Sequence, residues 1–482
     1  MHLFPILNVV GALLMLIGGV QLFPLLTALF SGEQDWQVFL YSGAGAFLLG
    51  GGLFFFSRSG KEISEKDGFA VVTLGWLMAA AAGAMPYYLS GVTAGFTDAF
   101  FESMSGFTTT GASVFTEYRG IGQGIFLWRS MTQWFGGMGI IVLALVILPA
   151  LGIGGMQLFK REVPGPYSEK MTPRLKDTAR ALWGVYLGMT IVESLVLVAM
   201  GMAPLEAINH ALTTVSTGGF STRGGSIGEY NSAAIEWVLI LFMVIAGMNF
   251  ALHYRALAQH THRNAHWRDL EWRWFMGVVV LVSLAVSIYL YFHEGYALSR
   301  ALTKGTFQVV SILTTTGFGS DDYVLWGAFP QLALLLLMIV GGCAGSTSGG
   351  VKWVRIILVF NFIRQEMLRL VHPKVVIHTR IGHIRVTQDI VGNILAFIFL
   401  YLTTLGVATL LLSLDGHSIL TSLGAAASAI GNIGPGLDAV GPAGNYAALS
   451  SWSKWVLISA MLLGRLELMT VFVLFSPRLW RK

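Results

Sequence analysis

Runs of about twenty apolar residues occupy most of this sequence, and that is the length an α-helix needs to cross the hydrocarbon core of a membrane. Only 11% of the 482 residues are charged and 55% are hydrophobic, whereas soluble domains carry about a quarter charged residues. Lipid offers the backbone no hydrogen-bond partners, so the spans must be helical. The sequence therefore predicts an all-α polytopic membrane protein with ten spans, at 4–30, 38–56, 69–89, 128–151, 182–203, 235–252, 274–292, 329–360, 390–412 and 455–475.

Charged residues are distributed unequally between the two sides of these spans. Lysine and arginine gather in the segments after the even-numbered spans, whereas acidic residues such as Glu33, Asp98 and Asp438 lie in the others. The positive-inside rule places the basic segments and both termini in the cytoplasm. Topology alone explains such basic segments, and docking of an acidic or nucleotide-binding cytosolic partner is the alternative. The first apolar run has no basic leader and is too long for a signal peptide, so we expect it to remain as a helix.

Two residue types that often form metal sites give little support for one here. The single cysteine, Cys343, excludes an internal disulfide and a thiolate cluster. Four histidines lie close together in one basic segment, and we expect them to form a solvated surface rather than a metal or pH site: His253, His260, His262 and His266.

A repeated design recurs in four semi-polar segments on the acidic side, at 97–113, 204–221, 297–320 and 417–436. Aligned on Gly111, Gly218, Gly317 and Gly434, each has roughly 12–15 residues of helix-compatible sequence before its glycine, too few to cross a bilayer. Three contain Ser/Thr-Thr-Gly and the fourth contains Asn-Ile-Gly. Irregular backbone at membrane depth is tolerated only where it lines water or is buried in protein. We therefore expect four pseudo-symmetric helix–pore loop–helix repeats around one central ion pore, preceded by an N-terminal helical hairpin.

These repeats divide the chain into a hairpin and four units. We expect the hairpin at 1–67 and the pore repeats at 68–175, 176–270, 271–385 and 386–482. Thr97 or Asp98 is expected to cap the first short helix, and Pro204 suits the opening turn of the second.

The chemistry of the repeated segments suits a monovalent cation. A half-helix that enters from the acidic side points its carbonyl end, with roughly half a negative charge, at the membrane centre. The residues that follow supply backbone carbonyls that can replace an ion's hydration shell, and glycine adopts backbone conformations that side chains disfavour. Calcium and magnesium usually require carboxylates instead. The candidate ion-binding residues are Thr109, Thr110, Gly111, Ser216, Thr217, Gly218, Thr315, Thr316, Gly317, Asn432, Ile433 and Gly434.

The motifs SGFTTTGAS, STGGFSTRGG, TTTGFGSDDY and GNIGPGL resemble the four filter segments of the TrkH family of bacterial potassium uptake proteins. The resemblance runs from about Gly68 to the C-terminus, and the hairpin before it resembles the extra helix pair of TrkH members. It implies a homodimer in the bacterial inner membrane with a cytosolic nucleotide-binding regulatory subunit of the TrkA type. It also implies potassium as the transported ion, because all four aligned positions are glycine.

Two further features resemble the gate of that family. The apolar run 332–340 breaks into small residues, which we expect to form an intramembrane loop below the filter: Gly341, Gly342, Cys343, Ala344, Gly345, Ser346, Thr347, Ser348, Gly349 and Gly350. A flexible helix end is the alternative. Arg465 lies within the last span, where a buried charge needs a partner or a role. It either pairs with another span, for which Glu193 is a candidate, or projects into the pore as a barrier, as the family's arginine does.

Other functions remain to be weighed against a selective, gated potassium pore. A sodium- or proton-coupled symporter could share this architecture, although repeats in one orientation favour a continuous pore over alternating access. A potassium-binding subunit of an ATP-driven pump is a second alternative. The sequence contains no HExxH, GxSxG or Walker motif, so we expect no enzyme activity, and we expect neither an organic cofactor nor a nucleic acid partner.

Overall fold

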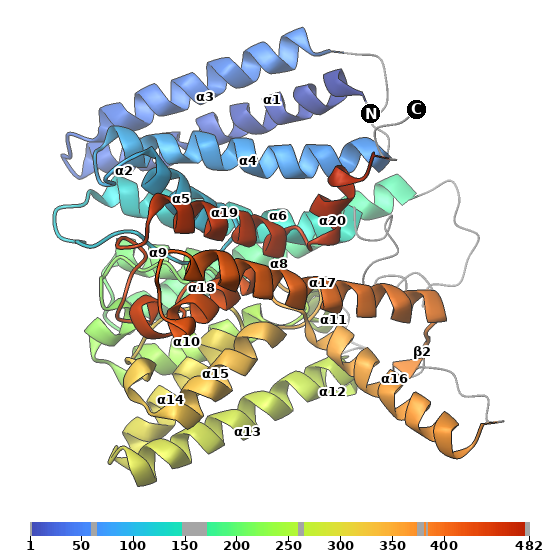
Figure 1. The fold of residues 1–482 in the computed structure, drawn as a ribbon. Coiled ribbons are helices and arrows are strands. Elements are labelled where there is room, and N and C mark those ends of the chain that lie inside the picture. Colours follow the sequence, from blue (N-terminus) through green and yellow to red (C-terminus); the bar gives the residue numbers. More distant parts are fainter. Residues whose placement is uncertain are drawn as a thin grey trace.

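The computed structural model describes residues 2–58, 65–146, 171–258, 265–373, 380–381 and 384–477. The chain begins with α1 (Leu3–Val20), α2 (Leu22–Phe30) and α3 (Trp36–Phe56), and α1 packs along both α3 and α4 (Glu65–Leu89) (Figure 1). Glycine permits this approach, because a Cβ atom at Gly11 would lie within 3 Å of the Gly50 carbonyl of α3. Between α2 and α3, the Glu33 carboxylate accepts from the N–H groups of Gln123 (2.6 Å) and Gly124 (3.3 Å) and so caps the start of α6 (Gln123–Val146).

Four helical units of one design follow the hairpin. In each, a half-helix of 12 to 16 residues packs between two flanking helices, too short to cross a bilayer. The units are α4, α5 (Phe96–Phe107) and α6 (Gln123–Val146); α8 (Met171–Ala199), α9 (Pro204–Val215) and α10 (Ala233–Ala246); α13 (Leu270–His293), α14 (Leu298–Leu313) and α15 (Ala328–Val340); and α17 (Gln388–Ser413), α18 (Ile419–Gly431) and α19 (Ser451–Arg465).

The four units close into a ring. The last helix of each unit packs against the half-helix of the next: α6 against α9, α10 against α14, α15 against α18, and α19 back against α5. Figure 1 shows the four half-helices toward one side of the molecule, while α11 (Phe250–Ala258), α12 (Ala265–Arg268) and α16 (Trp353–Val371) lie toward the other. The predicted all-α fold with four pseudo-symmetric repeats is confirmed. Its described β-structure is one antiparallel pair, β1 (Arg380–Ile381) with β2 (Ile384–Arg385).

The ten expected spans are only partly found as continuous helices. Within the described residues, six helices are long and apolar enough to cross a membrane, and two bent pairs bring the number to eight. The expected spans 235–252 and 455–475 are these bent pairs: α10 turns by 97° into α11, and α19 turns by 104° into the segment formed by α20 (Met469–Phe472) and a 3-10 helix, Val473–Phe475. The run 329–360 is interrupted where the sequence predicted a small-residue loop, because α15 ends at Val340 and α16 begins at Trp353.

Local sequence explains where the half-helices begin. Pro204 occupies the opening turn of α9, as predicted, where its missing N–H costs no hydrogen bond. The predicted cap of α5 is wrong, because the helix begins at Phe96, after Gly95, and so includes both Thr97 and Asp98. The Ser418 hydroxyl caps α18 by accepting from the Thr421 N–H. The hydroxyls of Ser418 and Thr421 also donate to the Asp438 carboxylate. These bonds hold the pKa of that carboxyl below its usual value.

Candidate functional site

Each half-helix runs into an irregular segment at its carbonyl end, and the four segments share one backbone conformation. These re-entrant loops are residues 108–113, 216–221, 314–319 and 431–436. Each contains a non-glycine residue with a positive φ, which side chains disfavour: Thr109 (51°), Thr217 (53°), Thr315 (59°) and Asn432 (54°). Two residues later comes a glycine with a positive φ: Gly111 (84°), Gly219 (75°), Gly317 (81°) and Gly434 (106°).

The backbone corrects the sequence alignment of the second loop by one residue. Gly219, not Gly218, is equivalent to Gly111, Gly317 and Gly434. The hydrogen bonds support the same register. The Gly218 N–H donates to the carbonyl five residues earlier (2.8 Å), as the N–H of Thr110 in the first loop does (2.8 Å), so Gly218 is equivalent to Thr110. The sequence held a signal for this register, since Gly-Phe occurs at 219–220 in the second segment and at 317–318 in the third.

One consequence of this register concerns Ser216, which the alignment had placed among the ion-binding residues. Its position is that of Thr108 and Thr314, directly after the half-helix. All three hydroxyls donate back to a helix carbonyl four residues earlier, at 2.8, 2.6 and 2.7 Å respectively. Ser216 therefore ends a half-helix, and Thr217, Gly218 and Gly219 form the counterpart of the other three triplets.

A closed ring of contacts joins the four loops. A Cβ atom added to any of the four positive-φ glycines would lie within 3 Å of a carbonyl oxygen of the next loop, closer than real Cβ atoms approach. The pairs are Gly111 with the Gly218 oxygen, Gly219 with that of Thr316, Gly317 with that of Ile433, and Gly434 with that of Thr110. The four oxygens come from equivalent residues and follow the order of the repeats. A side chain at any of these glycines would displace the neighbouring loop.

A small cavity opens on the side of the ring where the chain leaves the loops. It has a volume of about 70 Å³, and all four positive-φ glycines line it. In the fourth loop, Asn432 replaces threonine and contacts the neighbouring first loop, because its Nδ2 donates to the Thr110 hydroxyl (3.0 Å) and to the Met461 carbonyl of α19 (3.0 Å). The fourth wall is thus chemically different but tied to the first.

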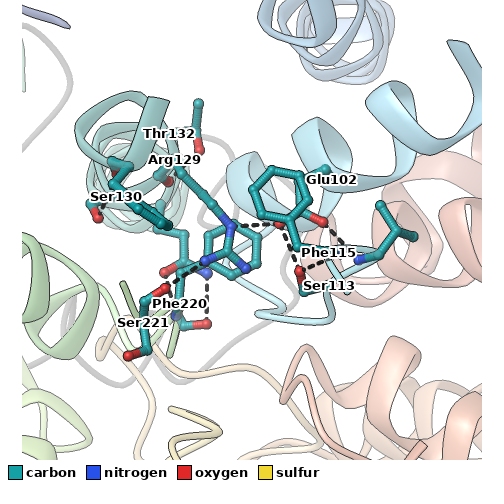
Figure 2. A network of polar contacts seen from close by, with 12 residues as sticks. Glu102, Ser113, Phe115, Arg129, Ser130, Thr132, Phe220 and Ser221 are labelled. Carbon is teal, nitrogen blue, oxygen red and sulfur yellow. Dashed lines mark hydrogen bonds and ion pairs between the residues drawn. The ribbon is translucent and has the colours of Figure 1, made fainter. Parts of the chain in front are cut away.

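A buried ion pair supports the first two loops from outside. The guanidinium of Arg129, on α6, lies between Glu102 of α5 and the second loop (Figure 2). Its Nε donates to the Glu102 carboxylate (2.5 Å) and its Nη1 to the Ser221 carbonyl (2.8 Å). The ring of Phe220 lies 3.6 Å from the guanidinium carbon, and Glu102 also accepts from the Val114 N–H (2.9 Å). Because both charges are 2% exposed or less, removing either would leave a costly unpaired charge.

The small-residue loop, residues 341–350, lies against the carbonyl ends of two half-helices and against the third re-entrant loop. The Thr347 hydroxyl donates to the carbonyl of Val215, the last residue of α9 (3.1 Å). The Gly349 N–H donates to the Thr315 hydroxyl of the third re-entrant loop (2.8 Å), and the Gly349 Cα packs against the carbonyl of Gly431, the last residue of α18. The loop therefore lies directly beneath the ring.

The two bent helices hold this loop in place. At the break between α10 and α11, the Gly247 carbonyl accepts from the Cys343 N–H (2.9 Å) and the Phe250 N–H donates to the Gly345 carbonyl (3.1 Å). Backbone groups freed by a break within a membrane need such partners. Near the break after α19, Glu467 pairs with Arg355 at the start of α16, and both side chains are buried.

Arg465 bridges the small-residue loop and α6. Its Nη1 donates to the Thr347 carbonyl (2.7 Å) and its Nη2 to the Gly136 carbonyl (3.0 Å). No ion pair joins it to Glu193 in the described part of the chain, so the structural pairing considered from the sequence is not found there. A buried arginine with carbonyl partners keeps its positive charge close to the ring.

Sequence reasoning missed several supporting residues. Gln133 of α6 donates to the Gly218 carbonyl (2.6 Å) and accepts from the Phe220 N–H (3.0 Å), and a glutamine within an apolar span was the available signal. Glu271 accepts from the N–H groups of Ala344 (2.7 Å), within the break between α15 and α16, and Val354 (3.0 Å), in the first turn of α16.

The expectation that the histidines are solvated is wrong for His253. Its Nε2 donates to the Ile245 carbonyl (2.9 Å), and its other ring nitrogen lies 3.2 Å from His266. His260 and His262 lie outside the described residues. No group of three or more potential metal ligands among His, Cys, Asp and Glu is found in the residues described.

Comparison with known proteins identifies the family that shares this architecture. The family model for TrkH, a cation transport protein, matches residues 35–482, so the likeness begins within the hairpin rather than near Gly68. Relatives named Trk system potassium uptake protein TrkH include one from Escherichia coli K12, 38% identical over 486 residues, and one from Halomonas elongata, 39% identical over 488 residues; each alignment covers 100% of both chains. The crystal structure of the potassium transporter TrkH from Vibrio parahaemolyticus superposes with a TM-score of 0.92 at 37% identity, covering 100% of both chains. This chain belongs to the TrkH family of cation transport proteins.

Proposed function

We propose that this protein takes up potassium across the inner membrane of a bacterium through a gated pore lined by the four re-entrant loops. The observation that carries the proposal is the closed ring formed by the carbonyl oxygens of Thr110, Gly218, Thr316 and Ile433 with the glycines that follow them. Full-length relatives named as potassium uptake proteins support the choice of ion.

The electrostatics of the site suit a monovalent cation. The carbonyl ends of four half-helices meet at the ring, and together they supply roughly two negative charges without a carboxylate in the path. Backbone carbonyls replace the hydration shell as the ion enters. The triplets 109–111, 217–219, 315–317 and 432–434 would bind the ion, and Ser216 would only end its half-helix.

The small-residue loop would close this pore from below. It contacts the ends of two half-helices and the third re-entrant loop, so an ion leaving the ring would meet it next. Arg465 would hold the loop closed through the Thr347 carbonyl and would place a positive charge below the ring. Both bent helices contact the loop or its neighbours, so a partner acting on them would reach the gate.

The assembly that we propose follows the resemblance of the sequence. The protein would form a homodimer with both termini in the cytoplasm, and a nucleotide-binding regulatory subunit of the TrkA type would dock on the basic side. The names of the relatives, which refer to a Trk system, support a multi-component transporter. The basic segments offer that partner a charged surface.

The test is ion flux into proteoliposomes that contain the purified chain alone. A potassium gradient would be the sole driving force, with sodium and proton gradients and ATP absent. We expect rubidium or potassium flux well above sodium flux. Flux that requires a sodium or proton gradient would indicate a symporter instead of a pore. Flux that requires an added ATPase subunit would indicate a component of a pump.

A further inference from the structure

A second ring of hydrogen bonds surrounds the ion-binding ring. It involves the carbonyl two residues after each positive-φ glycine, at Ser113, Ser221, Gly319 and Gly436. Each of these carbonyls accepts one hydrogen bond from outside its own loop. The donors are the Tyr446 N–H to Ser113 (2.9 Å), Arg129 Nη1 to Ser221 (2.8 Å), the Gly228 N–H to Gly319 (3.1 Å) and the Tyr323 hydroxyl to Gly436 (2.6 Å).

The outer ring runs in the same direction as the inner one. Arg129 belongs to the first repeat and bonds the second loop, Gly228 belongs to the second and bonds the third, Tyr323 belongs to the third and bonds the fourth, and Tyr446 belongs to the fourth and bonds the first. Every wall thus contacts the repeat before it twice, once through the carbonyl that precedes its ring glycine and once through the carbonyl two residues after that glycine. A displacement of one wall would pass to the next in both rings.

We propose that the outer ring fixes the spacing of the ion-binding carbonyls, and that its two side-chain members, Arg129 and Tyr323, are positioning residues for ion selection. This inference rests on the proposed function, because it concerns how the same pore distinguishes potassium from a smaller cation. Neither side chain donates to a carbonyl of the ion-binding ring itself, so each acts through the exit of its loop.

The chemistry of the two side chains explains why they suit this role. Tyr323 is fully buried, and its hydroxyl donates to the carbonyl of Gly436, so one uncharged hydrogen bond joins the third repeat to the exit of the fourth loop. Arg129 binds Glu102 and the Ser221 carbonyl with different nitrogens of one rigid plane. A lysine retains the charge but has a single nitrogen on a flexible stem, so it cannot reproduce that fork.

A merely structural role for these residues predicts a different result. If they only stabilised the fold, their variants would lower the melting temperature or reduce potassium and sodium flux in proportion. A positioning role predicts a change in the ratio of the two fluxes, because a loosened ring admits the smaller ion more readily. Tyr323→Phe is the sharper variant, since it removes one oxygen and no charge.

The experiment compares Tyr323→Phe with Tyr401→Phe in proteoliposomes under a potassium or a sodium gradient. Tyr401, in α17, is a matched control, because its hydroxyl is also buried but has no hydrogen-bond partner in the described structure. We expect Tyr323→Phe to lower the potassium-to-sodium flux ratio about threefold to tenfold, as loss of one buried neutral hydrogen bond allows. Tyr401→Phe should retain the wild-type ratio, and Arg129→Lys should change it in the same direction as Tyr323→Phe.

The outcomes separate this inference from the function on which it rests. Absence of potassium-selective flux in the wild-type protein would refute the proposed pore. A selective wild type whose ratio is the same in Tyr323→Phe and Tyr401→Phe, with both variants natively folded, would refute the outer ring as a determinant of selection. If Arg129→Lys fails to fold, Tyr323→Phe alone decides.

Discussion

Replacing Arg465 with alanine should open the pore without a partner. The guanidinium donates to the Thr347 carbonyl of the small-residue loop and to the Gly136 carbonyl of α6, but only the Thr347 bond holds the loop. A hydrogen bond to a charged group contributes about 1.5–3 kcal/mol. If opening breaks this bond, its loss shifts the equilibrium between closed and open states by that amount, and basal potassium flux rises about 10- to 150-fold at 1.4 kcal/mol per decade.

The assay is passive rubidium uptake into proteoliposomes, normalised to the amount of folded protein measured by size-exclusion chromatography. Arg465→Lys should give an intermediate flux, because one ammonium cannot reach both carbonyls with the same geometry. Arg369→Ala is the control, since this partly exposed arginine pairs with Glu366 on α16, and its loss should leave flux unchanged. Natively folded Arg465→Ala with wild-type flux would refute the idea that this arginine closes the gate.

Substitutions at three other places test separate parts of the site. Gly219→Ala should abolish selective flux, because its left-handed backbone costs an L-residue about 1–2 kcal/mol before the clash with the next loop, whereas Gly218→Ala should be milder. Thr347→Val removes the hydrogen bond to Val215 and should raise basal flux about twofold to tenfold, the value of one neutral hydrogen bond. Glu102→Gln should lower the melting temperature by several degrees, because breaking a buried ion pair costs about 3–5 kcal/mol.

A different outcome would contradict each of these predictions. Equal loss of selective flux in Gly218→Ala and Gly219→Ala would contradict the assignment of Gly219, rather than Gly218, to the ring position of the second loop. Wild-type basal flux in Thr347→Val would mean that this contact does not hold the small-residue loop. The control for Glu102→Gln is Glu206→Gln, since Glu206 pairs with the partly exposed Arg223. A larger loss of stability at 206 than at 102 would contradict the importance assigned to burial.

Local patterns in the sequence were sufficient for the architecture. Apolar runs indicated most of the helices, and four short segments ending at glycine indicated half-helices between longer ones. The periodicity and length of an apolar run are local properties, so they predict a helix without knowledge of the fold. The break after Val340 was also visible, because ten consecutive small residues form no stable helix facing lipid.

Features that depend on contacts between distant residues could not be predicted. The apolar runs 235–252 and 455–475 do not predict their bends. At the first bend, the backbone groups freed by the break form hydrogen bonds to the small-residue loop. Near the second bend, Glu467 forms a buried ion pair with Arg355. The pairing of Arg129 with both Glu102 and the second loop joins residues 27 and 92 positions apart. The register error arose for a related reason, because two adjacent glycines fit the motif equally well until the backbone distinguishes them.

The most direct test of the central claim is a crystal structure of the protein grown with rubidium or thallium, with the ion located by its anomalous scattering. We predict an anomalous peak enclosed by the carbonyl oxygens of Thr110, Gly218, Thr316 and Ile433, with Gly219 rather than Gly218 at the ring position of the second loop. Ions bound elsewhere, with none at this ring when the monovalent cation is saturating, would contradict the claim that the four re-entrant loops form the ion-binding site.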